Sequence, residues 1–73
     1  MNKTNMISVI DKNGHRMFLQ FIDYFTGECA FTDNPMNAAK YINDDELLQA
    51  DCALIYRDLG LTPEIFQVKH KFI

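Results

Sequence analysis

An Asn-Gly pair at residues 13 and 14 constrains the fold of this chain more than any other short stretch. Apolar residues alternate on both sides of the pair, which is the pattern of two antiparallel strands joined by a tight turn. A type I′ turn requires positive φ at both central residues, and Asn-Gly adopts it readily. The sequence therefore predicts a hairpin with a two-residue loop.

This loop length sets the register of the predicted hairpin, with Ile10 facing Met17 and Val9 facing Phe18. Side chains alternate between the two faces of a strand, so the register also divides the apolar residues between the faces. We expect the larger apolar set to face the core, namely Met6, Ile10, Met17, Leu19 and Phe21.

A third strand is predicted over residues 28–32, after a turn in which Gly27 supplies the left-handed conformation. The turn also contains two aromatic residues, Tyr24 and Phe25. They could form a protruding apolar tip, but in a domain of this size we expect them to fold back and cover the core.

Two helices are predicted to follow the third strand. Asn34 is a good N-cap and proline suits the first helical position, so we expect a short helix from Pro35 to Tyr41. Residues 43–46, Asn-Asp-Asp-Glu, have the spacing of a capping box. A second helix should run from there to Leu59 and end at Gly60.

The last segment, residues 65–73, alternates apolar and polar side chains and is predicted to be a strand. An alternative is that Thr62 caps one helical turn, Pro63 to Phe66, before the strand begins. The order β-β-β-α-α-β predicts a single α+β domain over residues 1–73, with an antiparallel sheet of three to four strands and the helices packed on one face. A chain of 73 residues makes one domain, and its core must be small.

The second predicted helix carries a seven-residue pattern. Asp44, Asp51 and Asp58 recur every seven residues and share one stripe, and two leucines, Leu47 and Leu54, lie just beyond it. The seam expected to face the core lies beside this stripe and consists of Leu48, Cys52, Ile55 and Leu59, with Tyr56 at its edge.

Two interpretations of this pattern are open. In the first, both leucines reach the edge of the core and only the middle aspartate is awkwardly placed. In the second, the helix presents an exposed apolar and acidic surface to a protein partner or a second copy of the chain. A partner of such a surface would present Lys and Arg, as nucleic-acid-binding proteins do. The candidate partner-binding residues are Asp44, Leu47, Asp51, Leu54 and Asp58.

The charge distribution favours a protein partner over a nucleic acid. The chain has a net charge of -3, and residues 33–60 carry six acidic against two basic residues. Affinity for a phosphate backbone depends on clustered Lys and Arg, so direct nucleic-acid binding is not expected. With 48% apolar residues the chain should fold, and no stretch approaches the ~20 apolar residues of a membrane span.

Neither the cysteines nor the N-terminal residues indicate export. Cys29 and Cys52 lack the framework of a disulfide-rich secreted domain, and the apolar run within residues 1–10 is too short for a signal peptide. We therefore expect a cytoplasmic protein with two free thiols.

No catalytic, metal-binding or nucleotide-binding motif occurs in the sequence. His15 and His70 lack a second ligand at metal spacing, and no Ser or Cys has a sequence-local base. The three glycines occupy turn or cap positions, which leaves no phosphate-binding loop. We expect neither enzymatic activity nor a cofactor.

The stretch FTDNPMNAAKYINDDELLQADCALIYRDLG, with IDKNGHRMFLQFID before it, resembles a recurring type of small protein encoded by phages and prophages of low-GC bacteria. The likeness lies in a strand ending at residues 31–34, an Ala- and Lys-containing turn at residues 38–40, and a helix ending in Leu59-Gly60. Proteins of this type frequently bind a host protein, defence nucleases included, and block or redirect it. The resemblance assigns no catalytic or binding residue.

Together with this resemblance, the sequence favours a small non-catalytic protein-binding module, phage- or prophage-derived, that inhibits or redirects a host or defence protein in the manner of an anti-CRISPR or host-takeover protein. One alternative is a nucleic-acid-binding accessory protein that uses Lys12, Arg16, Lys69 and Lys71. Another is a self-associating structural domain, such as a homodimer formed through an edge strand or through the ridge of Leu47 and Leu54.

Overall fold

Strand β1 (Thr4–Ile10) is the centre of the structure and pairs with three other strands. The computed structural model describes residues 3–68, and all of its strands pair antiparallel. Strands β2 and β4 lie along one edge of β1, and β5 lies along the other. Strand β3 pairs with β2. The other elements are β2 Arg16–Ile22, β3 Cys29–Thr32, a 3-10 turn Pro35–Asn37, β4 Tyr41–Ile42, helix α1 Asp45–Leu54, a π-helical segment Ile55–Leu59 and β5 Glu64–Val68.

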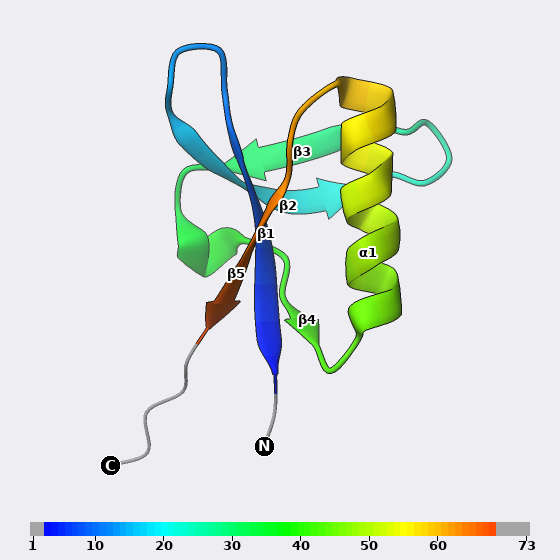
Figure 1. The fold of residues 1–73 in the computed structure, drawn as a ribbon. Coiled ribbons are helices and arrows are strands. Elements are labelled where there is room, and N and C mark those ends of the chain that lie inside the picture. The colour runs from blue at the N-terminus through cyan, green and yellow to red at the C-terminus, as the bar shows by residue number, and fades with distance from the viewer. Residues whose placement is uncertain (1–2, 69–73) are drawn as a thin grey trace.

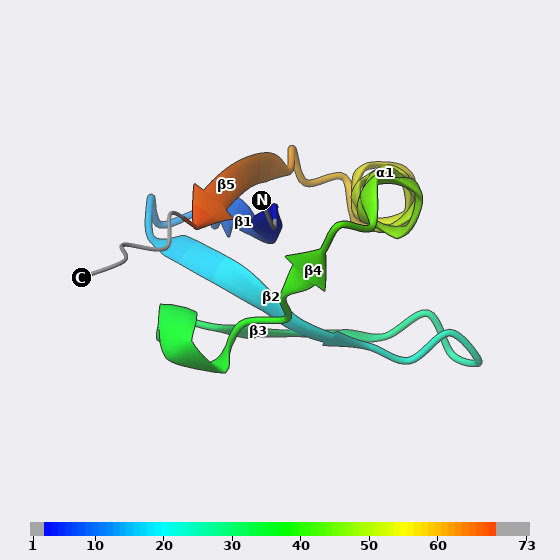
Figure 2. The ribbon, with the colours of Figure 1, turned by 90° about the horizontal axis from the view of Figure 1, so that it is seen from below.

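The described residues form one sheet and one α-helix, a small α+β fold of the class that the sequence predicts (Figure 1). Figure 2 shows β1 and β5 on one level, β2 and β3 on another, and α1 to one side. β1 is buried on both faces, because every residue from Thr4 to Val9 is at most 8% exposed. Two core clusters therefore form, one on each face of this strand.

The hairpin between β1 and β2 forms where predicted, but its loop has three residues rather than two. The backbone N–H of Asp11 donates to the carbonyl of His15, and Gly14 takes a positive φ of 83° while Asn13 does not. One carboxylate oxygen of Asp11 accepts from the N–H groups of Asn13 and His15, each at 2.9 Å, which favours the longer loop and lowers the pKa of Asp11. Ile10 consequently faces Arg16 instead of Met17.

This one-residue shift makes the predicted core face wrong for β1, whereas in β2 Leu19 is buried and Met17 packs against the larger cluster, as expected. A shift of one residue exchanges the two faces of a strand, so Ile10 is 40% exposed while Ile7 and Val9 are buried. The larger cluster, between the sheet and α1, contains Ile7, Val9, Leu19, Ile22, Tyr41, Leu48 and Ile55. The smaller cluster, on the other face of β1, contains Met6, Phe18 and Ala38, with Phe66 and Val68 packed against it.

A bulge at Gln20 changes the faces again within β2. Leu19 pairs with Phe31 but Phe21 pairs with Ala30, so one residue of β2 has no partner in β3. A bulge bends its strand and reverses the alternation beyond it. For this reason Ile22 enters the core, and Phe21, which we expected there, is 60% exposed.

The first predicted helix is only a 3-10 turn. Asn34 caps it as predicted, because its side-chain oxygen accepts from the N–H of Met36 at 3.0 Å, and Pro35 opens it. The turn ends at Asn37, and the chain then extends into β4, which pairs with the free part of the β1 edge at residues 4 and 5. The predicted order with two helices is therefore wrong, since tertiary pairing with β1 overrides the local helical pattern.

Helix α1 begins one residue later than the predicted capping box. Asp44, not Asn43, is the N-cap, and its carboxylate accepts from the N–H of Leu47 at 3.2 Å. Asn43 has a positive φ of 54°, and its side-chain oxygen accepts from the N–H of Lys3. Gly60 ends the helical run in the left-handed conformation, as predicted. Leu59, expected in the core seam, is 40% exposed, because a π-helical segment alters the angular spacing of its residues.

Strand β5 starts at Glu64 and pairs with β1 from Thr4 to Ser8. This excludes the alternative of a helical turn from Pro63 to Phe66. Residues 69–73 of the predicted last strand lie outside the described residues.

Candidate functional site

The predicted partner-binding residues do not form one exposed stripe along α1. Asp51 is only 2% exposed, and Leu54 is half-buried against the larger core cluster. Asp44 caps the helix, while Asp58 is exposed beside Arg57, whose Nε lies 3.3 Å from its carboxylate. Leu47 is 42% exposed.

The interpretation in which Asp51 is exposed to a partner is therefore wrong for this residue. It lies on the buried side of α1 together with Leu48, next to the buried Ile55 of the following π-helical segment. Its carboxylate accepts hydrogen bonds from the hydroxyls of Tyr41 and, at 2.8 Å, Tyr24. These two phenols provide the polar partners without which a buried carboxylate would be strongly destabilising.

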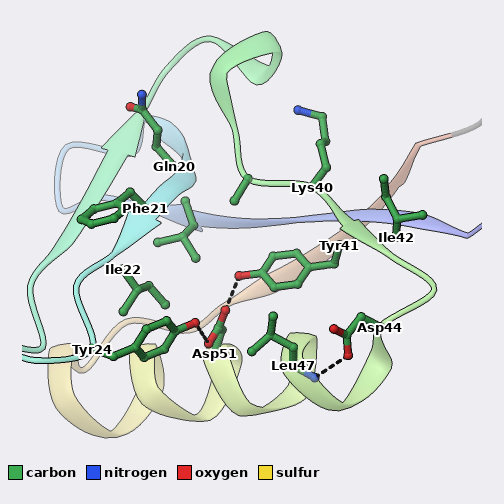
Figure 3. Close-up of a pocket in the computed structure, with 12 residues that line it drawn as sticks. Gln20, Phe21, Ile22, Tyr24, Lys40, Tyr41, Ile42, Asp44, Leu47 and Asp51 are labelled. Carbon is green, nitrogen blue, oxygen red and sulfur yellow. Dashed lines mark hydrogen bonds between the residues drawn. The ribbon is translucent and has the colours of Figure 1, made fainter.

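The Tyr24–Asp51–Tyr41 network joins three separate parts of the chain. Tyr24 comes from the loop between β2 and β3, Tyr41 from β4 and Asp51 from α1, and both hydroxyls point at the carboxylate (Figure 3). Burial, and then the hydrogen bond to Asp51, raise the pKa of Tyr24 to about 12. The same two causes raise the pKa of Tyr41 well above its ordinary value. Both side chains therefore remain hydrogen-bond donors at neutral pH.

The two cysteines lie close enough to Asp51 to be affected by its charge. Burial, and then that negative charge, raise the pKa of the Cys29 and Cys52 thiols. A thiol must ionise to act as a nucleophile, so this environment lowers the reactivity of both residues. Within residues 3–68, no group of three His, Cys, Asp or Glu side chains is arranged to hold a metal ion.

A groove of about 410 Å³ lies above this network, between the end of β2, the β4 segment and the first half of α1. Figure 3 shows Tyr24 and Tyr41 directed at Asp51, with Gln20, Lys40 and Ile42 pointing away from it. The lining consists of Leu19, Gln20, Phe21, Ile22, Tyr24, Ala39, Lys40, Tyr41, Ile42, Asp44, Leu47 and Asp51.

Large apolar side chains surround the groove. We call Phe21, Tyr24, Ile42 and Leu47 its apolar rim; their exposed fractions are 60%, 63%, 59% and 42%. Phe25, next to the rim in the same loop as Tyr24, is fully exposed at 101%, so the expectation that it folds back is wrong. Tyr24 folds back only in part, because its hydroxyl reaches Asp51 in the interior while the side chain stays largely exposed.

Sequence reasoning found Asp44, Leu47 and Asp51 of this groove and missed the other lining residues. The aromatic pair in the turn after β2 was the one signal that pointed to it. The outward position of Phe21 depends on the bulge at Gln20, which has no local sequence signature.

Comparison with known proteins gives no match to a family model, a curated protein or a solved structure. Of the helices formed by residues 3–68, none has the length and apolar character needed to cross a membrane.

Proposed function

We propose that this protein is a small non-catalytic protein-binding module whose contact surface is the groove with its apolar rim and Phe25. The observation that carries the proposal is the exposure of four large apolar side chains around one concavity, from β2, the loop after it, β4 and α1, with the fully exposed Phe25 in the same loop as Tyr24. Exposed apolar groups gathered in this way are typical of protein interaction sites.

The composition and rigidity of this surface support the proposal. Three of the five side chains are aromatic, and aromatic residues dominate the energetically important positions of protein interfaces. The hydrogen bonds from Tyr24 and Tyr41 to Asp51 hold the loop, β4 and α1 together. A surface that is already ordered loses less conformational entropy when it binds.

The partner that we propose is a host or defence protein, which the module inhibits or redirects in the cytoplasm of a host cell. The resemblance to small phage and prophage proteins supports this choice of partner. Direct binding of nucleic acid is less well supported, because Arg16 is already engaged: it donates to Ser8 Oγ, lies 3.6 Å from Glu64 and stacks over Phe66. Lys69 and Lys71 lie outside the described residues.

The test compares partner capture by three immobilised variants and the wild-type protein. Phe21→Ser and Phe25→Ser should each reduce the amount of a specific host protein that is retained by about tenfold or more, as for central interface residues. Met36→Ser is the matched control, because Met36 is 85% exposed but does not line the groove. Equal retention by all four proteins, or no specific retention by the wild type, would contradict the proposal.

A further inference from the structure

We propose that the groove receives an arginine side chain from the partner protein, with the guanidinium against the rings of Phe21 and Tyr24 and above the carboxylate of Asp51. The inference rests on the proposed function and specifies the chemistry of the partner.

The first argument is the charge of the groove. Asp51 has no ion-pair partner among the described residues, and its two hydrogen bonds come from neutral phenols. A carboxylate has about four acceptor positions, so two hydrogen bonds from neutral groups leave its charge uncompensated, and at 2% exposure that charge acts on a guanidinium in the groove mainly through space. Its charge acts in a region of low dielectric constant, where the attraction of a cation is stronger than in water.

The other charged side chains of the groove reinforce this preference. Asp44 is a second carboxylate in the lining. Lys40 is the single cation among the lining residues, and its ammonium donates to the carbonyls of Pro35 and Ala38, each at 2.8 Å. Its side chain extends away from Asp51 (Figure 3). The lining therefore presents two carboxylates and no cation directed at Asp51.

The second argument is the aromatic lining. Phe21, Tyr24 and Tyr41 all line the groove. The faces of aromatic rings attract cations, and guanidinium groups stack on them more often than ammonium groups do. The protein itself provides an example, because the guanidinium of Arg16 lies 4.6 Å from the centre of the Phe66 ring. Aromatic rings beside a carboxylate favour arginine over an apolar or acidic side chain.

The test is an NMR titration of the ¹⁵N-labelled protein with three five-residue peptides that differ only at their centre: arginine, lysine or citrulline. Citrulline has nearly the shape of arginine but no charge. The arginine peptide should shift the amide signals of Phe21, Tyr24, Ile42 and Leu47, and the citrulline peptide should bind about tenfold more weakly because the charge-assisted contacts are lost. The lysine peptide should be intermediate, since it cannot stack as a plane.

Two variants and a matched control locate the charge that matters. Asp44→Asn should lower the affinity for the arginine peptide about threefold, which is the effect of removing one charge at roughly 6 Å in water. Asparagine is chosen because it also serves as an N-cap, so the helix start is kept. Asp51→Asn should weaken it more, with a thermal melt to verify folding. Asp58→Asn removes the same charge outside the groove and should leave affinity unchanged.

Equal binding of the arginine and citrulline peptides, shifts located elsewhere, or no shifts at millimolar peptide would overturn the inference. If partner capture still depends on Phe25 in that case, the proposed function stands and only the arginine assignment fails. If the arginine peptide binds but capture is insensitive to Phe21 and Phe25, the proposed function fails instead.

Discussion

At the scale of single residues, Asp51 has the largest structural consequences. It is a buried carboxylate held by two phenols and by no cation within residues 3–68. Removing one member of such a group leaves the others buried without a partner, which costs more than the bond itself contributes.

We expect Asp51→Ala to lower the free energy of unfolding by about 3 kcal/mol, because two hydroxyls lose their acceptor. Tyr24→Phe should cost about 1 kcal/mol, the typical value of one hydrogen bond. Urea unfolding of both single variants and of the double variant measures these values and their coupling. Strictly additive losses would show that Asp51 stabilises the fold independently of Tyr24.

The raised tyrosine pKa values predict a loss of stability at alkaline pH. A tyrosine with a higher pKa in the folded state than its unfolded value of 10.0 contributes stability that is complete below about pH 10 and decreases as the pH rises through the folded value. The free energy of unfolding should therefore fall from about pH 10 upward, and Tyr41→Phe should flatten this dependence. The difference in absorbance at 295 nm between wild type and Tyr24→Phe should titrate near pH 12; a midpoint near pH 10 would mean that Tyr24 does not contact Asp51.

Several residue roles were predictable because their causes are local. Gly27 and Gly60 are left-handed and Asn34 is an N-cap, as the sequence indicates. The role of Asp51 was not predictable, since its donors lie 27 and 10 residues away and helical periodicity alone places it beside the seam.

At the scale of elements, the bulge in β2 determines which side chains reach the groove. Leu19 and Ile22 both enter the core although three positions separate them, and Phe21 is turned outward between them. The bulge thus supplies a rim residue without removing an apolar residue from the core.

Deletion of Gln20 tests this role. Leu19, Phe21 and Ile22 would then alternate regularly opposite β3, so the fold should remain within about 1 kcal/mol of wild-type stability. The bend at the groove should be lost, and partner capture should fall as in Phe21→Ser. Cross-strand NOEs between Ile22 and Cys29 monitor the pairing, and Gln20→Ala, which keeps the bulge, is the control. Loss of the pairing between Ile22 and Cys29 would show that the bulge maintains the register of β2 with β3 rather than the bend of β2 at the groove.

The hairpin and the β4 segment show why elements are predicted better than their registers. Asn-Gly fits both a two-residue loop and a three-residue loop with glycine in the left-handed position. Asp11 decides between them through its two backbone acceptor bonds. β4 has two residues and no pattern of its own, and it exists because β2 leaves part of the β1 edge free.

At the scale of the whole molecule, β1 couples the two core clusters. Ile7 and Val9 belong to the larger cluster and Met6 to the smaller one. Loss of packing on one face of β1 should therefore weaken the other face as well.

Phe66→Ala tests this coupling, because Phe66 packs against the smaller cluster and contacts Phe18 edge to face. We expect a loss of about 2 kcal/mol, less than for a fully buried phenylalanine. Amide hydrogen exchange should show the same loss of protection at Leu48 in α1 as at Ile7 in β1. Ile65→Ser, at a neighbouring position that is 45% exposed, is the control and should change stability by less than about 1 kcal/mol. A loss of amide protection confined to β5 would show that the two core clusters unfold separately.

The bonds of Asp51 also affect the kinetics of the molecule. They close chain segments of 27 and 10 residues, and the contact of longer range, between Tyr24 and Asp51, is expected to form late in folding. Interactions that are absent from the transition state slow unfolding and leave the rate of folding unchanged. The two phenols and their carboxylate therefore set how long a groove lasts once it has formed, rather than how quickly it forms.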